Sequence, residues 1–127
     1  MFQGLNVFNV AHAMATHAGH RQAVVSQNIA NADTPGYKAQ DITAFADVVQ
    51  GDRTSGMRAS RAGHLDGAAG AGGWQSFTTD AQTDPNGNSV SVELEILKGV
   101  ETKRQHDRAI AIYKSSLNIL RTSLGRT

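Results

Sequence analysis

The sequence predicts a mainly α protein with two long helices, one near each end, that form a coiled-coil-like pair. Apolar side chains recur at alternating spacings of three and four residues in both regions, which is typical of helices that pack along a seam. Eight of the 13 glycines lie between Gly51 and Gly87, so we expect a flexible or partly β middle segment. The chain of 127 residues is short enough for one domain, 1–127, and without cysteine it has no disulfide framework and no thiolate metal site.

The first predicted helix covers residues 5–31, a stretch with no proline and one internal glycine. The side chains of its seam are expected to form the contacts through which subunits assemble. The apolar members of this seam are Phe8, Ala11, Ala15, Ala18, Val25 and Ile29.

Residues 32–50 are predicted to form a turn and an extended segment, and residues 51–90 a flexible middle that includes the Gly/Ala run 66–73. The last predicted helix covers residues 91–125. Asn88–Ser91 supply N-cap side chains, and Gly125 marks the expected stop. Its seam has a polar centre at Lys103 and His106. The apolar members are Val92, Ile96, Ile110, Tyr113, Leu117, Leu120 and Leu124.

Two helices alone make a small core, so these seams are expected to pack on each other, parallel or antiparallel, or on equivalent helices of neighbouring subunits. Charge is also divided along the chain. From Lys98 onward, seven Lys or Arg residues stand against two acids, and the preceding residues carry five against nine. This polarity suits head-to-tail contact between copies, although a solvated basic helix face explains it equally well.

The segment from Asn28 to Lys38 contains the densest local signals. Asn28 and Asn31 can bond the last open carbonyls of the first helix or adopt a left-handed conformation. Pro35 and Gly36 favour a type II turn. From these local conformational preferences alone, the segment is predicted to end the first helix and nothing more.

The same segment resembles the N-terminal signature of the flagellar rod, hook and hook-associated proteins, and within them the basal-body rod proteins of the proximal rod. The short chain and residues 84–90 before the last helix strengthen this resemblance. The signature positions are Asn28, Ile29, Ala30, Asn31, Asp33, Thr34, Pro35, Gly36 and Tyr37.

The resemblance implies a structural subunit without catalysis or cofactor, polymerised into the periplasmic drive shaft that transmits motor torque. It implies synthesis in the cytoplasm and passage through the flagellar type III export apparatus without a cleaved signal peptide. The implied partners are copies of itself, other rod proteins and the membrane-ring adaptor at the rod base. Phe45 and Val49 resemble a short export element, although Phe45 has packing against the first helix as an alternative role.

Other classes of function have weaker support. Asp84, Asn86, Asn88 and Glu95 fit the ligand spacing of a calcium loop, but Ser89 stands where that loop needs glycine. His12, His17 and His20 are favoured as solvent or interface residues over metal ligands. No membrane-spanning segment and no catalytic motif is predicted.

A small helical nucleic-acid-binding protein is the alternative function, because the last helix carries several cations that could pair with phosphates. A net charge of +1 and the long apolar seam disfavour nucleic acid as a partner. These cations are Lys98, Lys103, Arg104, Arg108, Lys114 and Arg121.

Overall fold

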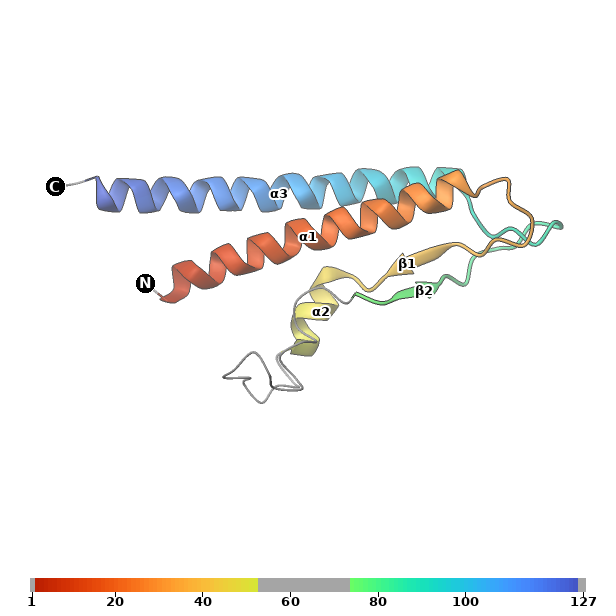
Figure 1. Ribbon diagram of the computed structural model, residues 1–127, viewed down its shortest axis with the longest axis horizontal. Coiled ribbons are helices and arrows are strands. Elements are labelled where there is room, and N and C mark those ends of the chain that lie inside the picture. Colours follow the sequence, from red (N-terminus) through yellow and green to blue (C-terminus); the bar gives the residue numbers. More distant parts are fainter. Residues whose placement is uncertain (1, 53–73, 126–127) are drawn as a thin grey trace.

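The computed structural model describes residues 2–52 and 74–125, and it confirms the mainly α fold with a pair of long helices (Figure 1). Helix α1 spans Phe2–Ala30 and helix α3 spans Val92–Leu124. The two helices run antiparallel, so the start of α1 and the end of α3 lie at the same end of the molecule. At the other end, which we call the closed end, two turns connect the helices to the middle of the chain.

The middle of the chain forms a two-stranded antiparallel sheet beside α1. Strand β1 spans Gln40–Ile42 and strand β2 spans Ser76–Thr78, with Asp41 opposite Phe77. Helix α2 follows β1 and spans Phe45–Asp52. The Gly-rich run 66–73 lies outside the described residues.

Helix α2 differs from the extended segment that the sequence predicts through residue 50. The carbonyl of Ala44 accepts hydrogen bonds from the amides of Asp47 and Val48, at 3.0 and 3.2 Å, which begins a helical turn. Asp47 places a negative charge in that first turn, where it interacts favourably with the helix dipole. Residues 45–50 contain no glycine or proline, and the helix continues to Asp52.

Both ends of α3 follow the predicted signals. Ser91 is the N-cap, and its hydroxyl accepts from the amide of Leu94 at 3.5 Å. The helix ends before Gly125, whose amide donates to the carbonyl of Arg121 at 2.8 Å. Gly125 has a φ of −83°, so this stop does not use a left-handed residue.

Two glycine turns meet at the closed end. The amide of Tyr37 donates to the carbonyl of Thr34 at 3.2 Å and Gly36 has a φ of +75°, so the predicted type II turn is confirmed. In the second turn the amide of Gly87 donates to the carbonyl of Asp84 at 2.8 Å, and Gly87 has a φ of +83°. A Cβ atom on Gly87 would lie 3.3 Å from the Cα of Gly36, so the two turns pack backbone against backbone.

The side chain of Asn88 holds the chain segment that leaves α1. The sequence pattern predicts a different role, since it places Asn88 among the N-cap candidates of the last helix. Its Nδ2 donates to the carbonyls of Asn31, Ala32 and Thr34, at 2.9, 2.9 and 2.8 Å. Its Oδ1 accepts from the amide of Val90 at 2.7 Å, and the residue is buried. These contacts tie the carbonyls of the turn after α1 to a side chain 57 residues away from Asn31.

An ion pair joins α1 to β1 and reaches α3. Arg21 donates two hydrogen bonds to the carboxylate of Asp41, both at 3.1 Å, and Lys98 Nζ lies 3.6 Å from the same carboxylate. Burial by itself raises the pKa of Asp41. Hydrogen bonds from Arg21 and from the Ile42 amide, with the charges of Arg21 and Lys98, outweigh burial and hold this pKa below its ordinary value.

Replacing Asn88 by Ala should lower the free energy of unfolding by about 1–3 kcal/mol, because the carbonyls of Asn31, Ala32 and Thr34 lose the Asn88 donor. Urea unfolding followed by circular dichroism measures this change. Asn88→Asp keeps the acceptor for Val90 but turns a carboxylate oxygen toward three carbonyls, so it should destabilise at least as much. An Asn88→Asp variant as stable as the parent would contradict the capping role.

The Asp41 pair should also give the protein an acid-sensitive stability. A carboxyl whose pKa is lowered in the folded state contributes stability above its unfolded pKa, and this contribution is lost as the pH falls through the folded pKa. Asp41→Asn should therefore be less stable than the parent at pH 6, and the difference should shrink below about pH 4. Urea midpoints of both chains at pH 6 and pH 3 measure it, and a difference independent of pH would refute this role.

Candidate functional site

The side chain of the signature residue Asn28 makes four hydrogen bonds at the closed end, as many as that of Asn88. The Nδ2 of Asn28 donates to the carbonyl of Gln40 at 2.7 Å and to Glu95 Oε2 at 3.0 Å. Its Oδ1 accepts from the Tyr37 hydroxyl and from the Gln40 amide, both at 3.1 Å. The side chain has no exposed surface, and all four of its hydrogen-bonding positions are used.

The remaining signature residues shape the turn or face solvent. Asn31 donates to the carbonyl of Gln27 at 2.8 Å, as predicted, whereas Asn28 turns inward and bonds no carbonyl of the helix end. Neither asparagine adopts the left-handed backbone conformation, because among the described residues only Gly36 and Gly87 have a positive φ. Burial, followed by the charge of Glu95, raises the pKa of Tyr37 and so favours the protonated hydroxyl that donates to Asn28. The exposed signature positions are Ile29, Ala30, Asp33, Thr34, Pro35 and Gly36.

Three polar side chains on one face of α1 each bridge the middle segment and α3. Asn28 joins Gln40 to Glu95, as described above. Arg21 joins Asp41 to Glu101, with its Nη1 3.6 Å from Glu101 Oε2. These two residues and His17 are spaced by four and seven positions, which places them on one face of the helix. We call this set the polar bridges: His17, Arg21 and Asn28.

His17 makes the third bridge and has no exposed surface. Its Nε2 lies 2.8 Å from the carbonyl of Thr43, and its Nδ1 lies 3.1 Å from Gln105 Nε2. A carbonyl can only accept, so Nε2 carries the proton and Nδ1 accepts from the Gln105 amide. The rings of Trp74 and Phe45 lie 5.0 and 5.5 Å from the imidazole. The predicted solvent or interface position is therefore wrong for His17, whereas His12 and His20 are exposed.

The face of α3 that meets α1 is largely polar. Glu95 and Thr102 are each 1% exposed, and Ala109 continues the same row seven residues later. Glu95 also accepts from Lys98 Nζ at 2.9 Å, so both of its carboxylate oxygens are paired. No buried side-chain nitrogen or oxygen lacks a hydrogen-bond partner in the described part of the chain.

The predicted seams are divided between the inside and the outside of the helix pair. On α1, Ala11, Ala18 and Val25 are buried, Phe8 and Ala15 are half-buried and Ile29 is exposed. Of the predicted seam residues on α3, only Ile110 is half-buried. Phe8 and Tyr113 connect the two seams, with ring centroids 5.2 Å apart. The exposed α3 seam residues, 39–78% accessible, are Val92, Ile96, Tyr113, Leu117, Leu120 and Leu124.

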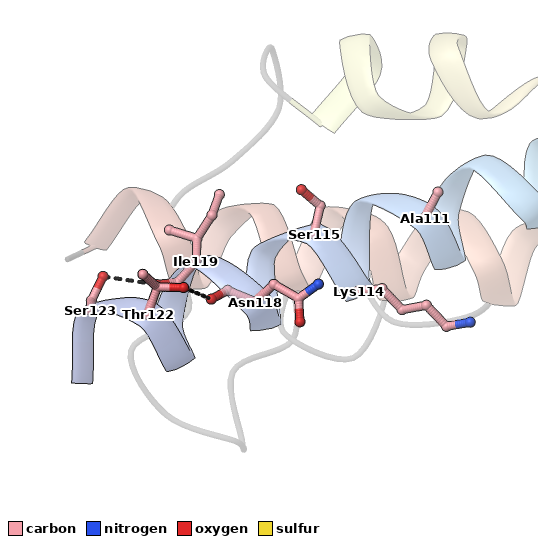
Figure 2. Close-up of a pocket in the computed structure, with 7 residues that line it drawn as sticks. All are labelled: Ala111, Lys114, Ser115, Asn118, Ile119, Thr122 and Ser123. Atoms are coloured by element: carbon pink, nitrogen blue, oxygen red, sulfur yellow. Dashed lines mark hydrogen bonds between the residues drawn. The ribbon is translucent and has the colours of Figure 1, made fainter. Parts of the chain in front are cut away.

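A shallow hollow follows one side of α3, lined by side chains of that helix alone (Figure 2). The hydroxyls of Thr122 and Ser123 donate to helix carbonyls, and Lys114 is the charged residue of the lining. Over residues 2–52 and 74–125, no three His, Asp or Glu side chains are grouped closely enough to hold a metal ion. The lining residues are Ala111, Lys114, Ser115, Asn118, Ile119, Thr122 and Ser123.

The other predicted features occupy ordinary positions in the fold. Asn88 and Glu95, from the calcium pattern, are both committed to the contacts described above. Of the six cations on α3, Lys98 pairs with Glu95, and Lys103 pairs with Asp107 at 2.8 Å. The predicted export residues Phe45 and Val49 are half-buried on α2. Within the described ranges, no helix is long and apolar enough to cross a membrane.

A family model described as "Flagella basal body rod protein" matches residues 13–38, which contain all three polar bridges and the signature turn. Curated relatives match most of the chain. The flagellar basal body rod protein FlgB of Aeromonas hydrophila is 29% identical over 107 residues, which cover 82% of this chain and 81% of the relative. FlgB of Cereibacter sphaeroides is 27% identical over 105 residues, covering 82% of each chain.

A further relative matches almost from end to end. FlgB of Agrobacterium fabrum is 31% identical over 125 residues, and the match covers 89% of this chain and 88% of the relative. A match of this length includes the closed end and large parts of both long helices, beyond the stretch that the family model covers. The chain belongs to the family of flagellar basal body rod proteins.

Proposed function

We propose that this chain is a building block of the proximal rod of the flagellum, polymerised into the shaft that transmits motor torque, and that it catalyses no reaction. The supporting observation is the large aliphatic surface that α3 leaves uncovered. Leu94, Ile96, Leu97 and Ile119 are each more than half exposed. Exposed aliphatic surface of this extent is typical of a protein that associates with others.

The seam residues of α3 are the proposed contact surface for neighbouring subunits. Leu117, Leu120 and Leu124 recur on one side of the last two turns, where they are 39%, 43% and 78% exposed. Burying such side chains contributes roughly 25 cal/mol per Å² of apolar surface. The proposed partners are copies of this chain, other rod proteins and the membrane-ring adaptor at the rod base.

The charge distribution supports contacts between unlike ends. Arg108, Lys114 and Arg121 are exposed on the second half of α3, and Asp33, Asp84 and Glu93 are exposed at the closed end. Opposite charges at the two ends favour head-to-tail contacts, which propagate along a filament.

Export by the flagellar type III apparatus is part of the proposal. Phe45 and Val49 lie one helical turn apart on α2, so they share a face. In the folded chain Phe45 packs against His17, and presentation of this face to an export gate would require that packing to open.

Mass spectrometry of purified hook and basal-body particles from the source cell tests the proposed function. We expect this chain as a stoichiometric component. Its absence from particles in which other rod subunits are detected would refute the proposal.

Replacing Leu117 by Asp should lower incorporation into those particles by at least about tenfold, because a charge buried without a partner in the contact costs several kcal/mol. The free chain should unfold at nearly the parent temperature, since Leu117 is already 39% exposed. Leu117→Met keeps the apolar surface and should incorporate normally. Equal incorporation of the Asp and Met variants would exclude Leu117 from the contact surface.

A further inference from the structure

Helix α3 packs on α1 with a face that the hydrophobic effect alone would not select. Glu95, Thr102 and Gln105 lie toward α1, whereas Ile96 and Val100 are 55% and 48% exposed. Turning α3 about its axis would bring those aliphatic side chains against α1. Burial of their exposed apolar surface would be favourable, so another interaction must oppose this rotation.

The polar bridges provide that opposition. Rotation of α3 would remove Glu95 from Asn28 Nδ2 and Gln105 from His17 Nδ1. Asn28 and His17 have no exposed surface, so water could not replace the lost partners. Buried polar groups left without a partner cost more than the hydrogen bond itself contributes.

The Asn28–Glu95 contact is the most enclosed of the α3 contacts in the three bridges. Glu101, which faces Arg21, is 71% exposed at its side chain and lies 3.6 Å away. Glu95 is 2% exposed at its side chain, and its contact with Asn28 measures 3.0 Å. A single buried polar residue that selects one helix arrangement, at a cost in stability, is an established device in helix pairs.

We propose that Glu95 is the residue that determines which face of α3 packs on α1, acting through Asn28. Its pairing keeps the polar row inside and leaves the aliphatic face uncovered. That this free face serves rod assembly rests on the proposed function, whereas the selection of the face does not.

Cysteine pairs can report the orientation of α3, because the chain has no cysteine of its own. A Cβ on Gly99 would lie 3.8 Å from Val25 Cγ1, so Val25→Cys with Gly99→Cys should form a disulfide. Val100 lies about 100° farther around the helix, so Val25→Cys with Val100→Cys should not. The ratio of the two disulfide yields in the purified full-length chain measures the orientation.

With Glu95 present, the 25/99 pair should dominate. Glu95→Ala should lower the ratio of 25/99 to 25/100 yields by about tenfold or more, because Asn28 then lacks its α3 partner in either arrangement and rotation of α3 costs no further hydrogen bond there. Glu95→Gln keeps an oxygen acceptor for Asn28 and should retain the parent ratio. A parent ratio in Glu95→Ala would overturn the proposal.

Circular dichroism must show helix in each variant, and Glu95→Ser replaces Glu95→Ala in the same comparison if the alanine variant is unfolded. Incorporation into basal bodies gives a second readout, in which Glu95→Gln should assemble and Glu95→Ala should not. Normal assembly of Glu95→Ala would overturn the link between face selection and assembly. Absence of the parent chain from the particles would refute the proposed function, while the disulfide ratios would still decide the role of Glu95.

Discussion

Complete pairing of a buried carboxamide constrains the closed end of this protein. Asn28 contacts the turn through Tyr37, strand β1 through both backbone groups of Gln40, and α3 through Glu95. A shift of any one of these elements would leave a polar atom without a partner in a site that water does not reach. The relative positions of α1, β1 and α3 therefore depend on one side chain, and Asn88 fixes the path of the chain between them.

Polar contacts also fix α1 farther from the closed end. Arg21 and His17 each pair with one group of residues 41–43 and one group of α3, so the middle segment is held between the two helices by polar contacts. Apolar contacts fill the remaining positions with small or branched side chains such as Ala18 and Val25. Polar contacts have strict geometry, and they therefore specify one arrangement more sharply than the same number of aliphatic contacts would.

The periodicity of apolar residues predicts both long helices. Single residues such as Ser91 and Gly36 predict the approximate helix ends and the type II turn, because these features depend on local sequence. The periodicity could not predict which side of α3 meets α1. The aliphatic stripe of α3 is a stronger pattern than the row of Glu95, Thr102 and Ala109, and that row is recognisable only once Asn28 is known to lie opposite. From the local sequence, Asn88 and Glu95 are predicted to be residues of a helix start. Their partners Asn31 and Asn28 lie 57 and 67 positions away in the chain, so local patterns do not reveal them.

The face of α3 that packs on α1 carries polar side chains where a helical hairpin usually places aliphatic ones, and this has an energetic consequence for a protein that assembles with others. An aliphatic side chain contributes its burial energy once, either within the chain or at a contact with a neighbour. Because Glu95 and Thr102 lie inside the helix pair, Ile96, Leu97 and Leu120 stay exposed in the single subunit, and their burial energy remains available for contacts with neighbours. In the proposed rod, contacts with neighbours would cover these side chains, so folding of the helix pair and formation of subunit contacts would be energetically coupled.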